Sequence, residues 1–399
     1  MMISPARTGL PRLMPHFLAR RFRWNPAAVG LGLLLLLAAP VAGADDAWPV
    51  FRGGPQQLGV ASTTLSADPK LKWEIDVPDG VVATAAIVGG RVYAGTLGGQ
   101  VWCLKLDDGS QVWEFQTELP KNSFRPGFRG APAVANGLVY AGDEEGIVHA
   151  LDQATGKPAW TYELGGIIEG GIVPLTLDAG PSVLAGSEAG TLACLDALTG
   201  AERWTYEVGD RIACTVAVGD GRTFLAGCDG QLHVVDVETG EKQKTFPLAG
   251  PTLASPSLTD GTLYVPTQNG TVLAIDVAKN KPIWTADLDG ADLRSSTAVT
   301  GTRVLLGGGD RTLRALDRAT GETVWTHKTH SKIESSPVVV GDRVYVGASD
   351  RTLYGLDLAT GEQRWSYKVS RGVVASPAIA EGHLVIGVEG PKGALLCFE

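Results

Sequence analysis

A unit of about forty residues repeats along most of the chain. Its clearest copies place an Asp four residues before a Gly and then close on a Trp, as in Asp152, Gly156 and Trp160. With the looser copies included, the closing positions lie 40 to 47 residues apart: Trp73, Trp113, Trp160, Trp204, Lys244, Trp284, Trp325 and Trp365. Repeats of this length with several short strands per unit indicate a β-propeller, in which each unit forms one blade.

Each unit is predicted to form four short strands. In the copy that spans residues 332–369, alternating apolar and polar residues predict strands over 335–340, 343–347, 352–357 and 363–368. Turn residues separate these strands, and Gly361 suits its turn because glycine tolerates a positive φ. Since no helical periodicity follows the first 44 residues, the sequence predicts an all-β chain.

The count of units predicts eight blades, the last of them shared between the two ends of the domain. Seven complete units span about 81–369, and residues 371–399 supply three further strands but no Trp strand. The strand at 71–75, which carries Trp73, has no three strands before it. We therefore expect an eight-bladed propeller of four-stranded antiparallel blades over residues 70–399, closed by the N-terminal strand, which removes open sheet edges.

The repeated tryptophans are expected to dock between neighbouring blades, because a large flat ring buries much apolar area. This interpretation covers Trp73, Trp113, Trp160, Trp204, Trp284, Trp325 and Trp365. Lys244 breaks the pattern, so its blade should pack less tightly or make the contact through Phe246.

The first 44 residues resemble an export signal. Arginines at 20, 21 and 23 precede an apolar run over 27–39, and Ala42-Gly43-Ala44 predicts cleavage before Asp45. The run is short for a transmembrane helix, so no membrane insertion is expected after cleavage. A periplasmic or secreted protein is the expectation, with residues 45–69 forming an arm along the outer rim of the ring, or alternatively a partner-binding arm.

Charge and composition argue against several classes of function. The formal charge is −9, and loss of the five arginines in the first 44 residues lowers it to about −14, which disfavours nucleic acid as a partner. No sequence motif of a hydrolase, zinc protease or nucleotide-binding site is present, so catalytic and metal-binding residues are predicted to be none. The five cysteines are expected to be free, with a Cys214–Cys228 disulfide as the alternative.

One end of the central axis is the candidate binding site. The first strands share a slot for small or hydroxyl residues, namely Thr84, Thr215, Ser255, Ser296, Ser336 and Ser376. Charged residues precede this slot: Arg129, Glu169, Arg211, Arg294, Glu334 and Arg371. A mixed ring of this kind suits a carboxylate, a sugar or a peptide, or its members pair with one another. The acidic loops at 143–145 and 187–188 should lie on the same face.

An insertion at 118–129 adds aromatic residues near this face. Phe124 and Phe128 alternate with arginines, a pairing common in protein interfaces, although a loop folded onto its own blade is the other interpretation.

The repeat phrase A-x-D-x-x-T-G-x-x-x-W, as in Ala150 to Trp160 and Ala315 to Trp325, resembles that of pyrroloquinoline-quinone (PQQ) dehydrogenases and PQQ-like propellers. The eight units and their closure resemble BamB-like proteins, the propeller subunits of outer-membrane barrel assembly. The resemblance to quinone enzymes implies PQQ and calcium, held by adjacent cysteines, a stacking Trp and a Glu, Asn and Asp set. This chain has no adjacent cysteines and no large insertions, so no cofactor is expected. It also has no cysteine near the predicted cleavage point, unlike the lipid-anchored BamB-like proteins.

These observations favour a non-enzymatic, exported scaffold that binds an envelope protein or another ligand through its loop face. The alternatives are a PQQ-dependent oxidoreductase and an extracellular carbohydrate or peptide binder.

Overall fold

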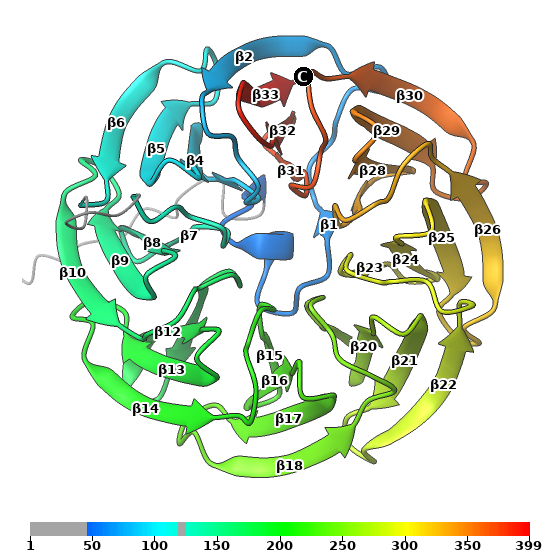
Figure 1. The fold of residues 1–399 in the computed structure, drawn as a ribbon, viewed down its shortest axis with the longest axis horizontal. Coiled ribbons are helices and arrows are strands. Elements are labelled where there is room, and N and C mark those ends of the chain that lie inside the picture. The colour runs from blue at the N-terminus through cyan, green and yellow to red at the C-terminus, as the bar shows by residue number, and fades with distance from the viewer. Residues whose placement is uncertain (1–45, 119–124) are drawn as a thin grey trace, which may run out of the picture. The chain divides into compact units, whose positions relative to one another are not determined.

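The computed structural model describes residues 46–118 and 125–399, so the predicted signal (1–44) and Phe124 lie outside the described residues. The described residues form eight blades of four antiparallel strands around a central axis, which confirms the predicted eight-bladed all-β propeller (Figure 1). One blade gains a short fifth strand, which pairs parallel with its innermost strand. Among these residues, no helix has the length and apolar character needed to cross a membrane.

The blades follow one another in chain order, and within each of the first seven the strands run from the axis outward. Blade 1 comprises β3 (Ala86–Ile87), β4 (Arg91–Gly95), β5 (Gln100–Lys105) and β6 (Gln111–Gln116), and blade 2 comprises β7 (Ala133–Ala135), β8 (Leu138–Gly142), β9 (Ile147–Asp152) and β10 (Pro158–Glu163). Blade 3 comprises β11 (Val173–Leu177), β12 (Gly180–Gly186), β13 (Thr191–Asp196) and β14 (Glu202–Glu207). Blade 4 comprises β15 (Ala217–Gly219), β16 (Arg222–Ala226), β17 (Gln231–Asp236) and β18 (Lys242–Pro247). Blade 5 comprises β19 (Ser257–Thr259), β20 (Thr262–Pro266), β21 (Thr271–Asp276) and β22 (Lys281–Asp287). Blade 6 comprises β23 (Ala298–Val299), β24 (Arg303–Gly307), β25 (Thr312–Asp317) and β26 (Thr323–Lys328). Blade 7 comprises β27 (Val338–Val340), β28 (Arg343–Ala348), β29 (Thr352–Asp357) and β30 (Gln363–Lys368).

Blade 8 joins the two ends of the domain, as predicted. It contains β31 (Ala378–Ala380), β32 (His383–Val388) and β33 (Gly393–Phe398), and its outer strand is β2 (Leu71–Val77). Strand β2 pairs antiparallel with β33, with Trp73 opposite Cys397 and Val77 opposite Gly393. The ring is therefore closed by hydrogen bonds between the first and last long strands.

The repeat phrase is a docking motif between blades. The indole Nε1 of Trp160 donates to the carbonyl of Ala197 in the next blade (3.0 Å), and the ring covers Gly200, where an added Cβ would lie 2.6 Å from it. All seven closing tryptophans donate to a carbonyl of the following blade in this way. The Trp of one copy and the Gly of the next are thus partners.

The exception at Lys244 is matched by a second exception across the same seam. Lys244 is exposed, and the residue that takes the glycine position in the next blade is Asn280, with φ of 53°. The carbonyl of Val277, which a Trp would reach, instead accepts from Arg222 Nη1 (3.1 Å). Phe246 packs at the edge of the cluster between these blades, as the sequence suggested. Where the Trp is missing, the Gly that would lie beneath it is missing too.

The N-terminal arm does not follow the outer rim, so that prediction was wrong. Residues 46–63 cross the centre of the ring, where Figure 1 shows them in blue. Within them, β1 (Val60–Ala61) pairs parallel with β27. Backbone amides of six innermost strands donate to arm carbonyls at 2.8–2.9 Å: Ile87, Val134, Val218, Leu258, Val299 and Val339. In these six blades the inner edge of the first strand has amides without a partner in the sheet, and the arm satisfies them.

Arg52 anchors the arm inside the axis. It lies in the 3-10 turn η2 (Phe51–Gly53), is 1% exposed, and donates to the carbonyls of Pro337 and Thr297, both at 2.7 Å. Burial lowers the pKa of Arg52 to about 9, so the guanidinium stays charged at neutral pH. The side chain packs against Gly59, where any Cβ would collide with it.

Candidate functional site

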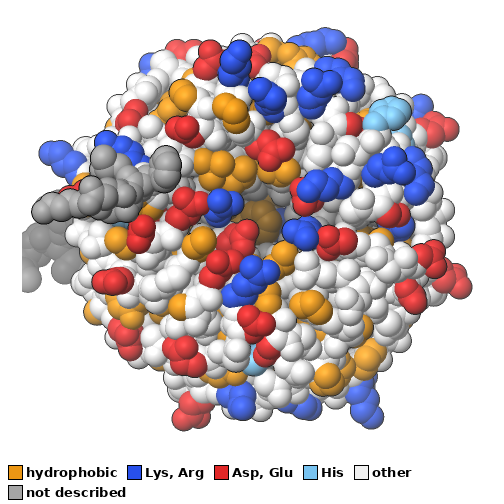
Figure 2. All heavy atoms as spheres, in the orientation of Figure 1, with side chains coloured by type: hydrophobic (Ala, Val, Ile, Leu, Met, Phe, Trp, Pro, Cys, Tyr) orange, Lys and Arg blue, Asp and Glu red, His pale blue; other side chains and the backbone are white. Residues whose placement is uncertain are grey.

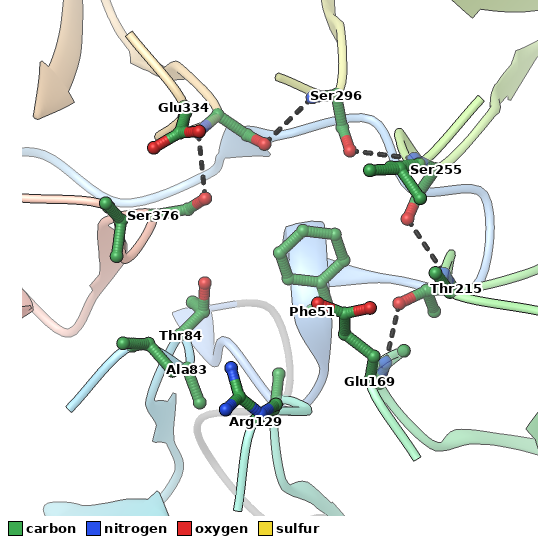
Figure 3. Close-up of a pocket in the computed structure, with 18 of the residues that line it drawn as sticks. Phe51, Ala83, Thr84, Arg129, Glu169, Thr215, Ser255, Ser296, Glu334 and Ser376 are labelled. Carbon is green, nitrogen blue, oxygen red and sulfur yellow. Dashed lines mark hydrogen bonds between the residues drawn. The ribbon is translucent and has the colours of Figure 1, made fainter. Parts of the chain in front are cut away.

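A belt of hydroxyl side chains runs around the axis from blade 3 to blade 8, just before the first strands. The amide of Thr215 donates to Ser255 Oγ, that of Ser255 to Ser296 Oγ, and that of Ser296 to Ser336 Oγ, each at 2.9 Å. Gly171 and Ser336 extend the belt at its two ends, through Thr215 Oγ1 (2.7 Å) and Ser376 Oγ (2.9 Å). The predicted hydroxyl slot thus ties blades 3 to 8 together (Figure 3).

A pocket of about 400 Å³ lies inside this belt. Its wall contains the hydroxyl residues, and Phe51 of the arm also lines it; Figure 3 shows the Phe51 ring at the centre of the pocket. In Figure 2 the centre of this face is hollowed, with acidic and basic side chains around the hollow. The sequence did not identify Phe51 as a site residue, since the path of the arm was unknown.

Four of the six predicted charged residues line the pocket: Arg129, Glu169, Arg294 and Glu334. Three of them follow an apolar residue that packs on a glycine of the preceding blade, as Ile333 does on Gly307. Arg294 follows Leu293, and blade 5 has Pro266 at the glycine position. The equivalent positions in the other blades are apolar: Val82, Ala213, Leu253 and Val374. Around the ring, an Arg and a Glu in blades 2 and 3 therefore face an Arg and a Glu in blades 6 and 7.

The other two predicted residues, Arg211 and Arg371, do not line this pocket. They precede the ring position by two and three residues, so they lie farther out on the loops. Arg211 approaches Glu188 (3.4 Å), and Arg371 lines a separate pocket with Glu389 and Arg351. In these two blades the ring position is the one directly after the packed apolar residue. Counting positions from that residue in the sequence would have shown that Arg211 and Arg371 do not line the pocket.

The two pocket arginines are each held by an acid at Nε. Arg129 Nε donates to Glu144 (2.6 Å) and Arg294 Nε donates to Asp292 (2.8 Å). These bonds place the acidic loop 143–145 beside the mouth, as expected. They also fix the orientation of each guanidinium through its Nε side. For the described residues, no hydrogen bond holds the terminal nitrogens of Arg129 or Arg294, which leaves both forks available to a ligand.

The two pocket glutamates differ in their surroundings. Glu334 pairs with Lys332 (3.0 Å), whereas Glu169 makes no ion pair with a described residue. Enclosure by the pocket raises the pKa of Glu169, and Glu188 adds to this, while Arg129, Arg211 and Arg294 oppose it. Glu169 is therefore the carboxylate most ready to accept hydrogen bonds from a ligand.

Phe128 is not an exposed anchor. It is 0% exposed, its ring is 5.8 Å from the His149 ring, and its Cβ covers Gly95 of the preceding blade. Phe128 occupies the packed apolar position of blade 2, equivalent to Ile333 in blade 7. Phe128 is thus buried between blades 1 and 2.

The axial residues do not fit the quinone cofactor and its calcium ion. No Trp, Asn or Cys lines the axial pocket, and the described residues contain no group of three His, Cys, Asp or Glu that could hold a metal. The five cysteines are free, and Cys214 Sγ contacts the carbonyl of Ala226 (3.2 Å) rather than Cys228.

The repeat and the closure of eight blades define a PQQ-like β-propeller, and comparison with known proteins agrees. A family model described as outer membrane protein assembly factor BamB matches residues 37–166, 144–253 and 243–398. The chain therefore belongs to this family.

Among curated proteins, BamB of Xanthomonas campestris pv. campestris is 37% identical over 84 residues, which cover 20% of this chain and 21% of that protein. The quinohemoprotein alcohol dehydrogenase ADH IIB of Pseudomonas putida is 34% identical over 99 residues, which cover 23% and 14%. The chain thus spans about a fifth or less of the length of these curated relatives.

Solved structures share the fold at low identity. BamB from Moraxella catarrhalis superposes with a TM-score of 0.69 at 20% identity, covering 83% of this chain and 97% of that one. Quinohemoprotein alcohol dehydrogenase from Comamonas testosteroni gives 0.73 at 16% identity, covering 88% and 80%.

Proposed function

We propose that this protein is an exported, non-enzymatic scaffold that binds a protein of the cell envelope through the face around the axial pocket. The observation that carries the proposal is the ring of free Arg forks and carboxylates at the centre of that face, Arg129, Glu169, Arg294 and Glu334. Charged groups at a mouth give a partner both orientation and specificity. Membership of the family described as an assembly factor for outer membrane proteins supports a partner in the envelope.

Site-specific cross-linking tests which face is used. A photo-reactive amino acid at Glu145, beside the mouth, should capture an envelope protein in the exporting cell, and one at Lys157, on a turn at the other end of the same blade, should not. Arg129→Glu should weaken capture at least several-fold, because it reverses the charge at the mouth. Lys157→Glu makes the same charge change and should leave capture intact. Equal capture by the cross-linkers at Glu145 and Lys157 would contradict the proposal.

A quinoprotein oxidoreductase is the second candidate, favoured by the alcohol dehydrogenase relatives. It predicts that the purified protein takes up PQQ in the presence of calcium, with a new visible absorption. We expect a flat titration, since the axial residues lack the ligand set; saturable uptake would favour the enzyme.

A further inference from the structure

We propose that the axial pocket is a binding site for a neutral saccharide unit. This site goes beyond the proposed protein partner and does not depend on it. The inference rests on three features of the pocket: its hydroxyl donors, its alternating charges and its aromatic floor.

The hydroxyl belt directs unused donors toward the axis. The oxygens of Thr215, Ser255, Ser296, Ser336 and Ser376 each accept a backbone amide, and all five side chains are 3–7% exposed. None of these five hydroxyls donates to a described residue, although all line the pocket. A hydroxyl whose oxygen already accepts a bond is polarised and becomes a stronger donor. Buried donors of this kind require a ligand or water.

The rim offers both signs of charge at matching positions. Arg129 and Glu169 occupy adjacent blades, and Arg294 and Glu334 occupy the blades across the axis. The apolar pairs Ala213 with Leu253 and Val374 with Val82 separate them. A simple anion in this pocket would meet Glu169, Glu334 and Glu389, and a simple cation would meet the two arginines. A neutral ligand whose groups both donate and accept satisfies the whole ring.

The floor adds an apolar surface. Phe51 is partly exposed, and the arm holds it in place through the buried Arg52 and through hydrogen bonds of Trp48 and Pro49 to blades 1 and 2. An aromatic ring beneath polar walls suits the C–H face of a sugar ring, which carries hydroxyls at its edge. A dipeptide has charged ends but no such face, so the floor favours the saccharide.

Ligand-observed saturation-transfer NMR on the purified chain from residue 45 tests this. Maltose, cellobiose and diacetylchitobiose are the saccharide probes; glycylglycine and sodium acetate are the zwitterion and anion arms. We expect transfer to at least one disaccharide at 10 mM, about the concentration needed for a weak site of ~1 mM Kd or above. Transfer to no disaccharide, or only to glycylglycine or acetate, overturns the proposal.

Variants locate the site. Phe51→Leu should weaken the responding disaccharide roughly five- to tenfold through loss of the aromatic surface. Glu169→Gln, at the exposed mouth, should weaken it without changing the fold, as thermal unfolding would verify. Arg211→Gln, outside the pocket, is the matched control and should bind as the unmodified chain does. Disaccharide binding that Phe51→Leu and Glu169→Gln both leave unchanged would place it elsewhere and overturn the assignment. Because no partner protein is present, failure here leaves the cross-linking result unaffected.

Discussion

Trp160 and Gly200 show at the scale of single residues why the repeat phrase is so regular. The ring of Trp160 lies where a side chain on Gly200 would be, and Gly200 has a φ of 74°. The residue pair at Lys244 and Asn280 shows the converse, since both partners change together. The regular spacing of Trp and Gly in the sequence therefore reflects a contact between two consecutive copies of the repeat.

Gly200→Ala is expected to destabilise the protein by about 2–4 kcal/mol, because it adds backbone strain and a collision with the Trp160 ring. Gly221→Ala is the matched control: its φ is 70°, yet nothing lies within 4 Å of an added Cβ, so about 1 kcal/mol of strain alone is expected. Urea unfolding of both variants measures the difference. Equal losses would show that the Trp contact contributes nothing.

At the scale of strands, the sequence predicted the outer elements better than the inner ones. Strands β29 and β30 match the predicted residues, because side-chain alternation and turn residues bound them. The predicted first strand at 335–340 begins only at Val338. Ser336 and Pro337 instead bond at the axis: Ser336 joins the hydroxyl belt, and the carbonyl of Pro337 accepts from Arg52. Hydrogen bonds between blades and to the arm replace the strand ladder there, and no local pattern encodes them.

Ser296→Ala should break one link of the belt. It leaves the buried amide of Ser255 without its acceptor, which costs about 1–3 kcal/mol. Ser296→Thr keeps the oxygen, as Thr215 does naturally in blade 4, where its Oγ1 accepts from the Gly171 amide, and should stay within about 1 kcal/mol of the unmodified protein. Hydrogen exchange at the Ser255 amide should accelerate in the Ala variant alone. Unchanged exchange there would mean that the belt bond is not formed in solution.

For the whole molecule, the architecture and the hydroxyl slot at the axis were predictable, and the arm that crosses the axis was not. Eight units and an unpaired strand with Trp73 sufficed to predict closure, since only one pairing leaves no open edge. The arm has no repeat and bonds through backbone carbonyls, which any residue supplies, so nothing in its side chains marked its path. For the same reason the sequence did not predict Phe51 as a site residue, since Phe51 lines the pocket only because the arm crosses the ring.

The arm should therefore behave as a removable part of a ring that closes without it. A chain that begins at residue 64 keeps β2 and the Trp73–Cys397 register, but leaves six inner-strand amides without their acceptors. At about 0.5–1.5 kcal/mol per bond, we expect a loss of several kcal/mol, seen as a lower midpoint of thermal unfolding with β-sheet circular dichroism retained. A peptide of residues 45–63 should raise that midpoint in a concentration-dependent way, because it binds only the folded ring. The same peptide with Gly59→Val should fail, since Gly59 has a φ of 65° and a side chain there meets Arg52. If the truncated chain unfolds at the same temperature as the full one, the arm fills the axis without stabilising the ring.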